Sequence, residues 1–211
     1  DGFNFWGGPT SNQEIDAIVI DADFMWVAGQ IRVDPEIGSR WAVVKMSLSG
    51  PKISAFGGGM VTYNPSIYDD VVTAMRLHDN KLYIGGHDNA PDGQWRVEVI
   101  DAGTGASVLT VTSDPSTGLD ALQDIVVDPA GSALYLVGSQ NWADPAWRIE
   151  KRDLATGALV TTFNTTGYVS NNISPGVDEA RAIVLDATHL YVGGSDSIPG
   201  NQQWRIEKRL K

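Results

Sequence analysis

The 211-residue sequence contains no cysteine. Disulfide bonds, thiolate zinc sites and thiol nucleophiles are therefore excluded. Histidine is scarce, with three residues at positions 78, 87 and 189. We expect His78 and His189 in turns on the side of the molecule opposite His87, so neither a histidine metal site nor a histidine-based triad is predicted. Phosphate-loop, dinucleotide-binding and G-x-S-x-G motifs do not occur.

Positive charge is also limited. Fifteen Lys and Arg stand against 26 Asp and Glu, a formal net charge of -11. Nucleic acid requires a basic face, so it is not an expected partner, and docking on anionic lipid is disfavoured for the same reason. No apolar run reaches the 18 residues that suggest a transmembrane helix. The 42% of apolar residues, with seven Trp, are enough for a substantial core.

What the chain does contain is an internal repeat. The hexapeptide WRIEKR occurs at Trp147–Arg152 and again at Trp204–Arg209. It belongs to a longer unit made of an apolar run, a segment similar to LYVGG and a Trp. The Trp residues lie at positions 41, 95, 147 and 204, with spacings of 54, 52 and 57 residues. Four copies of one structural unit are therefore expected.

Each unit is predicted to form four short strands, which we name A to D. They are rich in β-branched and aromatic residues and are separated by turn residues. Strand A is predicted at 17–21, 74–78, 124–128 and 182–186, and strand B at 25–29, 82–86, 134–138 and 190–194. Strand C begins at each Trp, and strand D is predicted at Lys52–Phe56, Ser107–Val111 and Leu159–Phe163.

Four-stranded units repeated at this length predict an all-β fold, a β-propeller with four blades in a single domain spanning residues 1–211. The expected blades cover about 16–57, 73–113, 123–164 and 181–211. The last copy stops after strand C, and DGFNFWGG at Asp1–Gly8 is similar to the end of a unit, TGALVTTFNTTG at Thr156–Gly167. We therefore expect residues 1–8 to complete the fourth blade and close the ring.

The segments LYVGGSD, WRIEKRD and TGALVTTFNTTG resemble the extracellular β-propeller repeats of bacteria and archaea of the YVTN and delta-60 types. The resemblance extends over essentially the whole chain, and its motifs are structural. It implies the propeller fold and a secreted or cell-surface location, and it implies no particular activity. Those families usually build rings of more than four blades, so the chain is also compatible with part of a larger ring.

The repeated residues predict how blades pack. Alternate residues of a strand face opposite sides, so Trp147 and Ile149 share one face while Arg148 and Glu150 share the other. We expect the Trp to pack between neighbouring blades and the Arg and Glu to pair across strands or between blades. The Gly pair that ends each strand B predicts a close backbone approach or a bulge.

The loops indicate where a binding site would lie. The A–B and C–D turns are short, whereas the B–C and D–A connections are long and are expected to leave the propeller on one face. That face is predicted to be acidic. Its acids are Glu14, Asp34, Glu36, Asp69, Asp70, Asp88, Asp92, Asp114, Asp120, Asp144, Asp178, Glu179 and Asp196. Candidate ligand-binding residues there are Tyr68, Asp70, Asp120, Trp142, Tyr168 and Asp178.

Three of these acids are in register. Asp70, Asp120 and Asp178 each lie five residues before a core residue of strand A, and Gln13 holds the equivalent position in the first copy. If strand A lines the propeller axis, these four residues surround the mouth of the channel and form an oxygen-only set suited to Ca²⁺ or Mg²⁺. The alternative is that each Asp caps its own D–A turn. No other cofactor is expected.

The sequence predicts a non-enzymatic binding or scaffold module of an extracellular or cell-surface protein, with a protein or glycan partner on the acidic face. One alternative is a carbohydrate-active hydrolase that uses carboxylates of that face, although no particular pair stands out. Another is a purely structural subunit of a surface assembly. The chain is expected to be a monomer or to self-assemble.

Overall fold

The computed structural model describes residues 13–32, 38–89, 93–141, 145–198 and 201–211. The described part is all-β and contains no α-helix; one short 3₁₀ turn spans Gly57–Gly59. No helix in these ranges is long and apolar enough to cross a membrane. The predicted all-β class is confirmed.

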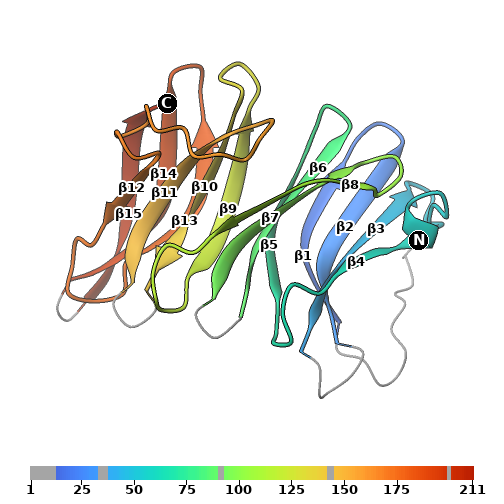
Figure 1. Cartoon of the computed structure of the whole chain (residues 1–211), viewed down its shortest axis with the longest axis horizontal. Coiled ribbons are helices and arrows are strands. Elements are labelled where there is room, and N and C mark those ends of the chain that lie inside the picture. The colour runs from blue at the N-terminus through green and yellow to red at the C-terminus, as the bar shows by residue number, and fades with distance from the viewer. Residues whose placement is uncertain (1–12, 33–37, 90–92, 142–144, 199–200) are drawn as a thin grey trace.

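The strands form four antiparallel sheets in chain order (Figure 1). The first sheet contains β1 (Gln13–Ile20), β2 (Phe24–Ile31), β3 (Arg40–Ser47) and β4 (Val61–Tyr63). The second contains β5 (Val71–His78), β6 (Lys81–Asp88), β7 (Gln94–Asp101) and β8 (Ser107–Ser113). The third contains β9 (Ala121–Asp128), β10 (Ala133–Gln140), β11 (Ala146–Asp153) and β12 (Tyr168–Asn171). The fourth contains β13 (Glu179–Leu185), β14 (His189–Ile198) and β15 (Asn201–Leu210).

The four sheets match the four predicted blades, and every predicted strand A, B and C is present. Neighbouring sheets pack through their first strands, β1 against β5, β5 against β9 and β9 against β13. The fourth sheet has three strands within the described residues. The expected completion of this sheet by Asp1–Gly8 lies outside the described residues.

Two of the three predicted D strands are wrong in position. Ser107–Val111 lies in β8, but the outer strands of the first and third sheets are β4 and β12, several residues beyond Lys52–Phe56 and Leu159–Phe163. Only isolated bridges, Met46 to Lys52 and Arg152 to Leu159, mark the predicted starts. In both sheets the chain then turns away before pairing resumes, so these two blades extend past the expected ends at residues 57 and 164.

Backbone conformation and packing explain the two detours. Gly57, Gly58 and Gly59 have positive φ in the first detour, as do Asn164 and Thr165 in the third sheet, which an extended strand does not allow. Each detour also directs one phenylalanine inward. Phe56 is fully buried between the first and second sheets. Phe163 is 8% exposed and packs edge-on against Tyr135, with the two ring centroids 5.9 Å apart. Burial of these rings holds the detours in place.

The hydrophobic core is divided among the three sheet-to-sheet interfaces. In each interface a Trp of strand C projects toward the next sheet, and Trp41, Trp95 and Trp147 are 0–1% exposed. Trp95 Nε1 donates to the Ser139 carbonyl at 3.3 Å, and Trp147 Nε1 donates to the Ser195 carbonyl at 2.8 Å. The predicted packing role of Trp between blades is confirmed for these three copies.

The acceptor side of this contact is a glycine. A Cβ added to Gly138 would lie 2.0 Å from the Ala121 carbonyl oxygen and 2.9 Å from Cζ2 of Trp95. The register also shifts beside the equivalent glycine in all four sheets, at Gly29, Gly86, Gly138 and Gly194. The predicted close approach and bulge are therefore both present, and glycine is required because a side chain would occupy the space of the backbone and the indole.

The repeated Arg and Glu pair along a single strand rather than across strands. In β11, Glu150 is fully buried and accepts from Arg148 Nε at 2.7 Å and from Arg152 Nη2 at 2.5 Å. Ser113 of the second sheet donates to the same carboxylate at 2.7 Å. The fourth sheet repeats this arrangement with Glu207 between Arg205 and Arg209. The residues are i and i+2 neighbours on one face, so their side chains lie side by side.

Candidate binding edge

The D–A loops and the described ends of the B–C loops lie on one edge of the sheets, which we call the long-loop edge. The Asp70 amide donates to the Ser39 carbonyl at 3.0 Å, joining the first D–A loop to a B–C loop. The Asn141 amide donates to the Asp120 carboxylate at 2.8 Å, and the Asp178 amide donates to the Pro145 carbonyl at 3.0 Å. The predicted grouping of the long loops is confirmed by these hydrogen bonds.

The three in-register aspartates each cap their own turn. A serine four residues earlier donates its hydroxyl to the Asp carboxylate, at 2.6 Å from Ser66 to Asp70, 2.7 Å from Ser116 to Asp120 and 2.6 Å from Ser174 to Asp178. The amide of the same serine donates to the second carboxylate oxygen at 3.2, 2.9 and 2.9 Å. The three D–A turns are therefore closed by one repeated Ser–Asp contact, with each Asp at most 1% exposed.

The repeated Ser is the residue that sequence reasoning missed. The chain reads NPSIYDD at 64–70, DPSTGLD at 114–120 and NISPGVD at 172–178, with Ser four residues before Asp each time. This spacing was the available signal for turn capping. The residues between Ser and Asp differ in every copy, so the spacing alone marks the capped turn in the sequence.

The pKa values of the three carboxyls shift in different directions, although all three accept the same Ser contact. Burial raises the pKa of Asp70 and of Asp120 above its usual range, and the hydrogen bonds from the serines offset this only in part. Burial acts in the same direction on Asp178, but hydrogen bonds from Ser174, Ile173 and Ser197 outweigh it and hold the pKa below its usual range. Asp178 accepts four such bonds, at 2.6–3.2 Å.

The structure keeps the proposed cation ligands apart within the part of the chain that it describes. No group of three or more His, Cys, Asp or Glu side chains lies close enough there to hold a metal ion. Asp70, Asp120 and Asp178 each bind their own turn, and Gln13 is exposed on β1. Calcium binding at the channel mouth stays a prediction of the sequence.

The acidic character of the edge is reduced by burial. Of the expected acids, Glu14, Asp69 and Asp114 are exposed, whereas Asp70, Asp88, Asp120, Asp178 and Glu179 are buried. Asp69 also forms an ion pair with Arg32 and accepts from the Ser39 amide at 2.8 Å. Asp34, Glu36, Asp92 and Asp144 lie outside the described residues. The surface of the described edge therefore carries less negative charge than the sequence implies.

Apolar side chains occupy the tips of the capped turns. Ile67 is 71% exposed, and Tyr68, Leu119, Ile173 and Val177 are 41–45% exposed. They lie between the Ser and the Asp of each turn, or next to that Ser, so the Ser–Asp contact fixes the backbone that carries them. Hydrogen-bonded turns with apolar tips therefore form a row along this edge.

The expected aromatic residues behave differently from one another. Tyr68 is exposed, as a ligand-binding residue would be. Tyr168 is half-buried under Arg148, whose guanidinium carbon lies 3.9 Å from the ring centroid, so its ring packs within the third sheet. Trp142 lies outside the described residues.

Comparison with solved structures bears on the fold alone. No family model matches the chain, and no curated protein matches it. Among solved structures, an α-L-arabinofuranosidase from Clostridium thermocellum matches over 93% of this chain and 68% of its own, with 13% identity and a TM-score of 0.50. BamB from Moraxella catarrhalis and the periplasmic gluconolactonase of Pseudomonas aeruginosa match over 93% of this chain with TM-scores of 0.43 at 15% and 11% identity.

The chain spans 50% and 57% of the length of these last two proteins. At these identities the likeness concerns the fold alone. Four successive antiparallel sheets that pack through their first strands, together with the likeness to the arabinofuranosidase, identify the architecture as that of a β-propeller.

Proposed function

We propose that this protein is a non-enzymatic binding module that presents the long-loop edge to a protein partner. The observation that supports this proposal is the row of exposed apolar side chains on turns fixed by buried Ser–Asp contacts. A preformed surface loses little conformational entropy when a partner binds, and apolar tips supply area that leaves water on binding. Protein is favoured over glycan because four of the five exposed tips are aliphatic and only Tyr68 offers a ring for stacking.

The location proposed for this module is outside the cell or at its surface. This proposal rests on the resemblance of its repeats to extracellular propellers.

A random peptide library displayed on phage provides the test. Peptides selected on the wild-type protein are compared for binding to an Ile67→Ser, Leu119→Ser, Val177→Ser variant, which keeps all three Ser–Asp contacts. We expect binding of the enriched peptides to weaken at least about tenfold, as for loss of well-packed anchors. Equal binding to the wild type and the variant would show that the edge is not the binding surface.

A hydrolase is the second candidate, favoured by one observation. The raised pKa of Asp70 and of Asp120 is the property that a general acid requires, and the arabinofuranosidase shows that a protein with a similar fold can be a glycosidase. A panel of nitrophenyl glycosides, including an α-L-arabinofuranoside, and a gluconolactone tests it. Turnover that disappears in Asp120→Asn would replace the binding proposal with this one. No turnover would exclude it for these substrates.

A further inference from the structure

The two end faces of the row of sheets are chemically complementary. Consecutive sheets bury one face against each other, so the row leaves one face of the first sheet and one face of the fourth sheet without a neighbouring sheet (Figure 1). The first and fourth sheets stand at opposite ends of the row. We call the free face of the fourth sheet the donor face and the free face of the first sheet the acceptor face.

The donor face carries the residues that fill every internal interface. Trp204 is 96% exposed, whereas its equivalents Trp41, Trp95 and Trp147 are 0–1% exposed. Ile206 is 78% exposed, and its equivalents Val43, Val97 and Ile149 are 0–1% exposed. The WRIEKR sequence is the same in β11 and β15, so the difference in exposure arises because the described residues place no sheet against this face of the fourth sheet.

The acceptor face shows the converse difference. Ile18 is 57% exposed, whereas Met75, Ile125 and Ile183 at the same position of strand A are 0–1% exposed. Ile15 is 44% exposed, and Val72, Leu122 and Ala180 at its equivalent position are 0–1% exposed. In the second, third and fourth sheets these side chains pack against the preceding sheet.

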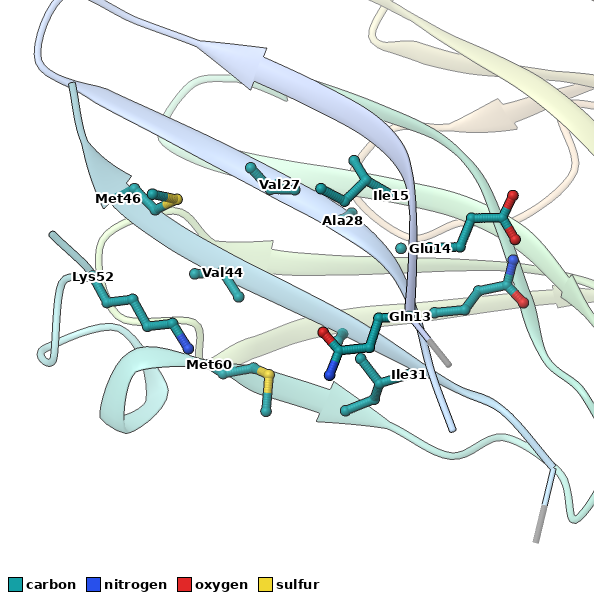
Figure 2. A pocket seen from close by; sticks show the side chains of 13 residues that line it. Gln13, Glu14, Ile15, Val27, Ala28, Ile31, Val44, Met46, Lys52 and Met60 are labelled. Atoms are coloured by element: carbon teal, nitrogen blue, oxygen red, sulfur yellow. The ribbon is translucent and has the colours of Figure 1, made fainter. Parts of the chain in front are cut away.

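The acceptor face also has the hollow that a Trp requires. A cavity of about 160 Å³ lies over β1–β3, lined by Ile15, Val27, Gly29, Val44, Met46 and Met60 among others (Figure 2). Its lining includes Gly29, the equivalent of Gly86 and Gly138, on which the indoles of Trp41 and Trp95 lie. Where β7, β11 and β15 carry Arg and Glu, β3 carries Ala42 and Val44, so the cavity is mostly apolar.

We propose that the donor face of one copy of this chain docks on the acceptor face of a second copy, repeating the Trp–Gly contact of the internal interfaces. Trp204 then lies on Gly29 of the second copy, and its Nε1 donates to the Gln30 carbonyl, as Trp147 Nε1 does to the Ser195 carbonyl. The contact is heterologous, because two different faces meet. In a dimer with a twofold axis, the donor face of each copy covers the acceptor face of the other, and the two copies form one closed ring. This proposal uses the sheet faces and does not depend on the long-loop edge.

Solution mass and mixing of two variants test the proposal. Light scattering on the wild type should give about twice 22.7 kDa at micromolar concentration. Trp204→Ala removes the indole of the donor face. Ile18→Lys places a charge in the apolar acceptor face. The dissociation constant of each variant's dimer should be at least about 30-fold higher than that of the wild type. This is the change expected for loss of a central aromatic anchor or for a charge buried in an apolar contact.

The mixture is the decisive arm. Trp204→Ala retains its acceptor face and Ile18→Lys retains its donor face, so a 1:1 mixture should form a dimer at a concentration at which each variant alone is monomeric. Both variants should fold, because both side chains are exposed in the single chain. Circular dichroism checks this. Val108→Lys, at a 52% exposed site on β8, is the matched control and should leave the dimer unchanged.

Three results would overturn the proposal. A wild-type monomer at all concentrations would mean that the faces close within one chain or meet a different partner. Self-association of Ile18→Lys alone would indicate that two donor faces meet each other. Two monomeric variants that fail to associate on mixing would also contradict a heterologous contact.

Discussion

The indole nitrogen of Trp147 in β11 donates to the carbonyl of Ser195 in β14, at 2.8 Å, across the boundary between the third and fourth sheets. This single bond links strand C of one repeat to strand B of the next, 48 residues later in the chain. Around it the indole is 1% exposed within an apolar cluster shared by the two sheets. The interface therefore depends on one large side chain that has both its apolar surface and its polar atom satisfied.

Replacement of this Trp should be costly. Trp147→Ala is expected to lower the free energy of unfolding by about 3–5 kcal/mol, because it leaves a cavity between two sheets. Trp204 holds the same position in the second copy of WRIEKR but is 96% exposed, so Trp204→Ala should change the stability of the single chain by less than about 1 kcal/mol. Denaturant unfolding at a concentration where the chain is monomeric compares the two. Similar losses in both variants would mean that Trp204 is covered in the single chain.

The Ser–Asp contact should contribute to the free energy of unfolding, as a substitution in the second D–A turn can show. Ser116→Ala removes the 2.7 Å hydroxyl bond to the buried Asp120 carboxylate, and we expect a loss of about 1–2 kcal/mol. Thr117→Ala, at the exposed next position, should change stability by less than about 0.5 kcal/mol. Thermal unfolding followed by circular dichroism distinguishes them. An equal effect of the two substitutions would contradict the capping role.

The buried carboxylate of Glu150 should be more sensitive than that of Glu207. Glu150→Gln leaves two Arg side chains, 8% and 9% exposed, without their counter-charge, and we expect a loss of about 3 kcal/mol or more. Glu207→Gln should cost less, because Arg205 and Arg209 are 26% and 31% exposed and retain water. Urea unfolding of both variants checks the order. A larger loss for Glu207→Gln would contradict it.

Acidification should reveal the opposite shifts of Asp178 and Asp120. The pKa of Asp178 is lowered on folding, so its contribution is present above its unfolded pKa, near 3.8, and is lost as pH falls through the lower folded value. The pKa of Asp120 is raised on folding, so its protonation favours the folded state as pH falls toward 3.8. Between pH 6 and 3, Asp178→Asn should therefore lose stability less steeply than the wild type and Asp120→Asn more steeply.

Denaturant midpoints measured across this pH range test both signs at once. Asn is the appropriate replacement because it keeps the size of the side chain and does not titrate. Its NH2 group replaces one acceptor oxygen by a donor in both variants, which lowers stability at every pH and leaves the slope with pH as the quantity to compare. Parallel curves for the wild type and both variants would show that neither carboxyl titrates differently in the folded and unfolded chains.

The cation site predicted at the channel mouth and the observed turn capping predict different responses to calcium: a bound cation should raise the melting temperature, whereas carboxylates that only cap their turns should leave it unchanged. The carboxylates of Asp70, Asp120 and Asp178 already accept hydrogen bonds from their own turns. A cation that binds only the folded state would raise the melting temperature. Thermal unfolding with millimolar Ca²⁺ and with chelator provides the measurement. A rise with Ca²⁺ that is absent in Asp120→Asn would establish the cation site predicted from the register of these residues.

Periodicity and residue type were sufficient to predict most of the sheet structure. Strands A to C follow from alternating apolar residues that have local partners in hairpins, so their positions depend little on distant contacts. The outer strands of the first and third sheets could not be placed in this way. There the positive φ of Gly57 and Asn164 and the burial of Phe56 and Phe163 override the strand propensity of KISAF and LVTTF.

The candidate site shows a similar division. The common edge of the long loops and the register of the three aspartates followed from the repeat. Their burial did not, because it depends on a Ser four residues away and on the neighbouring B–C loop. The two WRIEKR segments give the clearest limit: Trp147 is 1% exposed and Trp204 is 96% exposed, although six successive residues are identical. Only the presence of the next sheet distinguishes them.

The detours of the outer strands in the first and third sheets have a consequence for how such a chain can change in length. The extra residues, 53–60 and 160–167, lie beyond strand C at the rim, where the second sheet continues directly into β8. Residues inserted there shift neither the Trp nor the Gly that meet between sheets. The exposed part of the rim is therefore a suitable place to graft a peptide or a label. Gly58 offers a ready position, because it is exposed and an added Cβ would meet open space, whereas Phe56 and Gly59 beside it are buried.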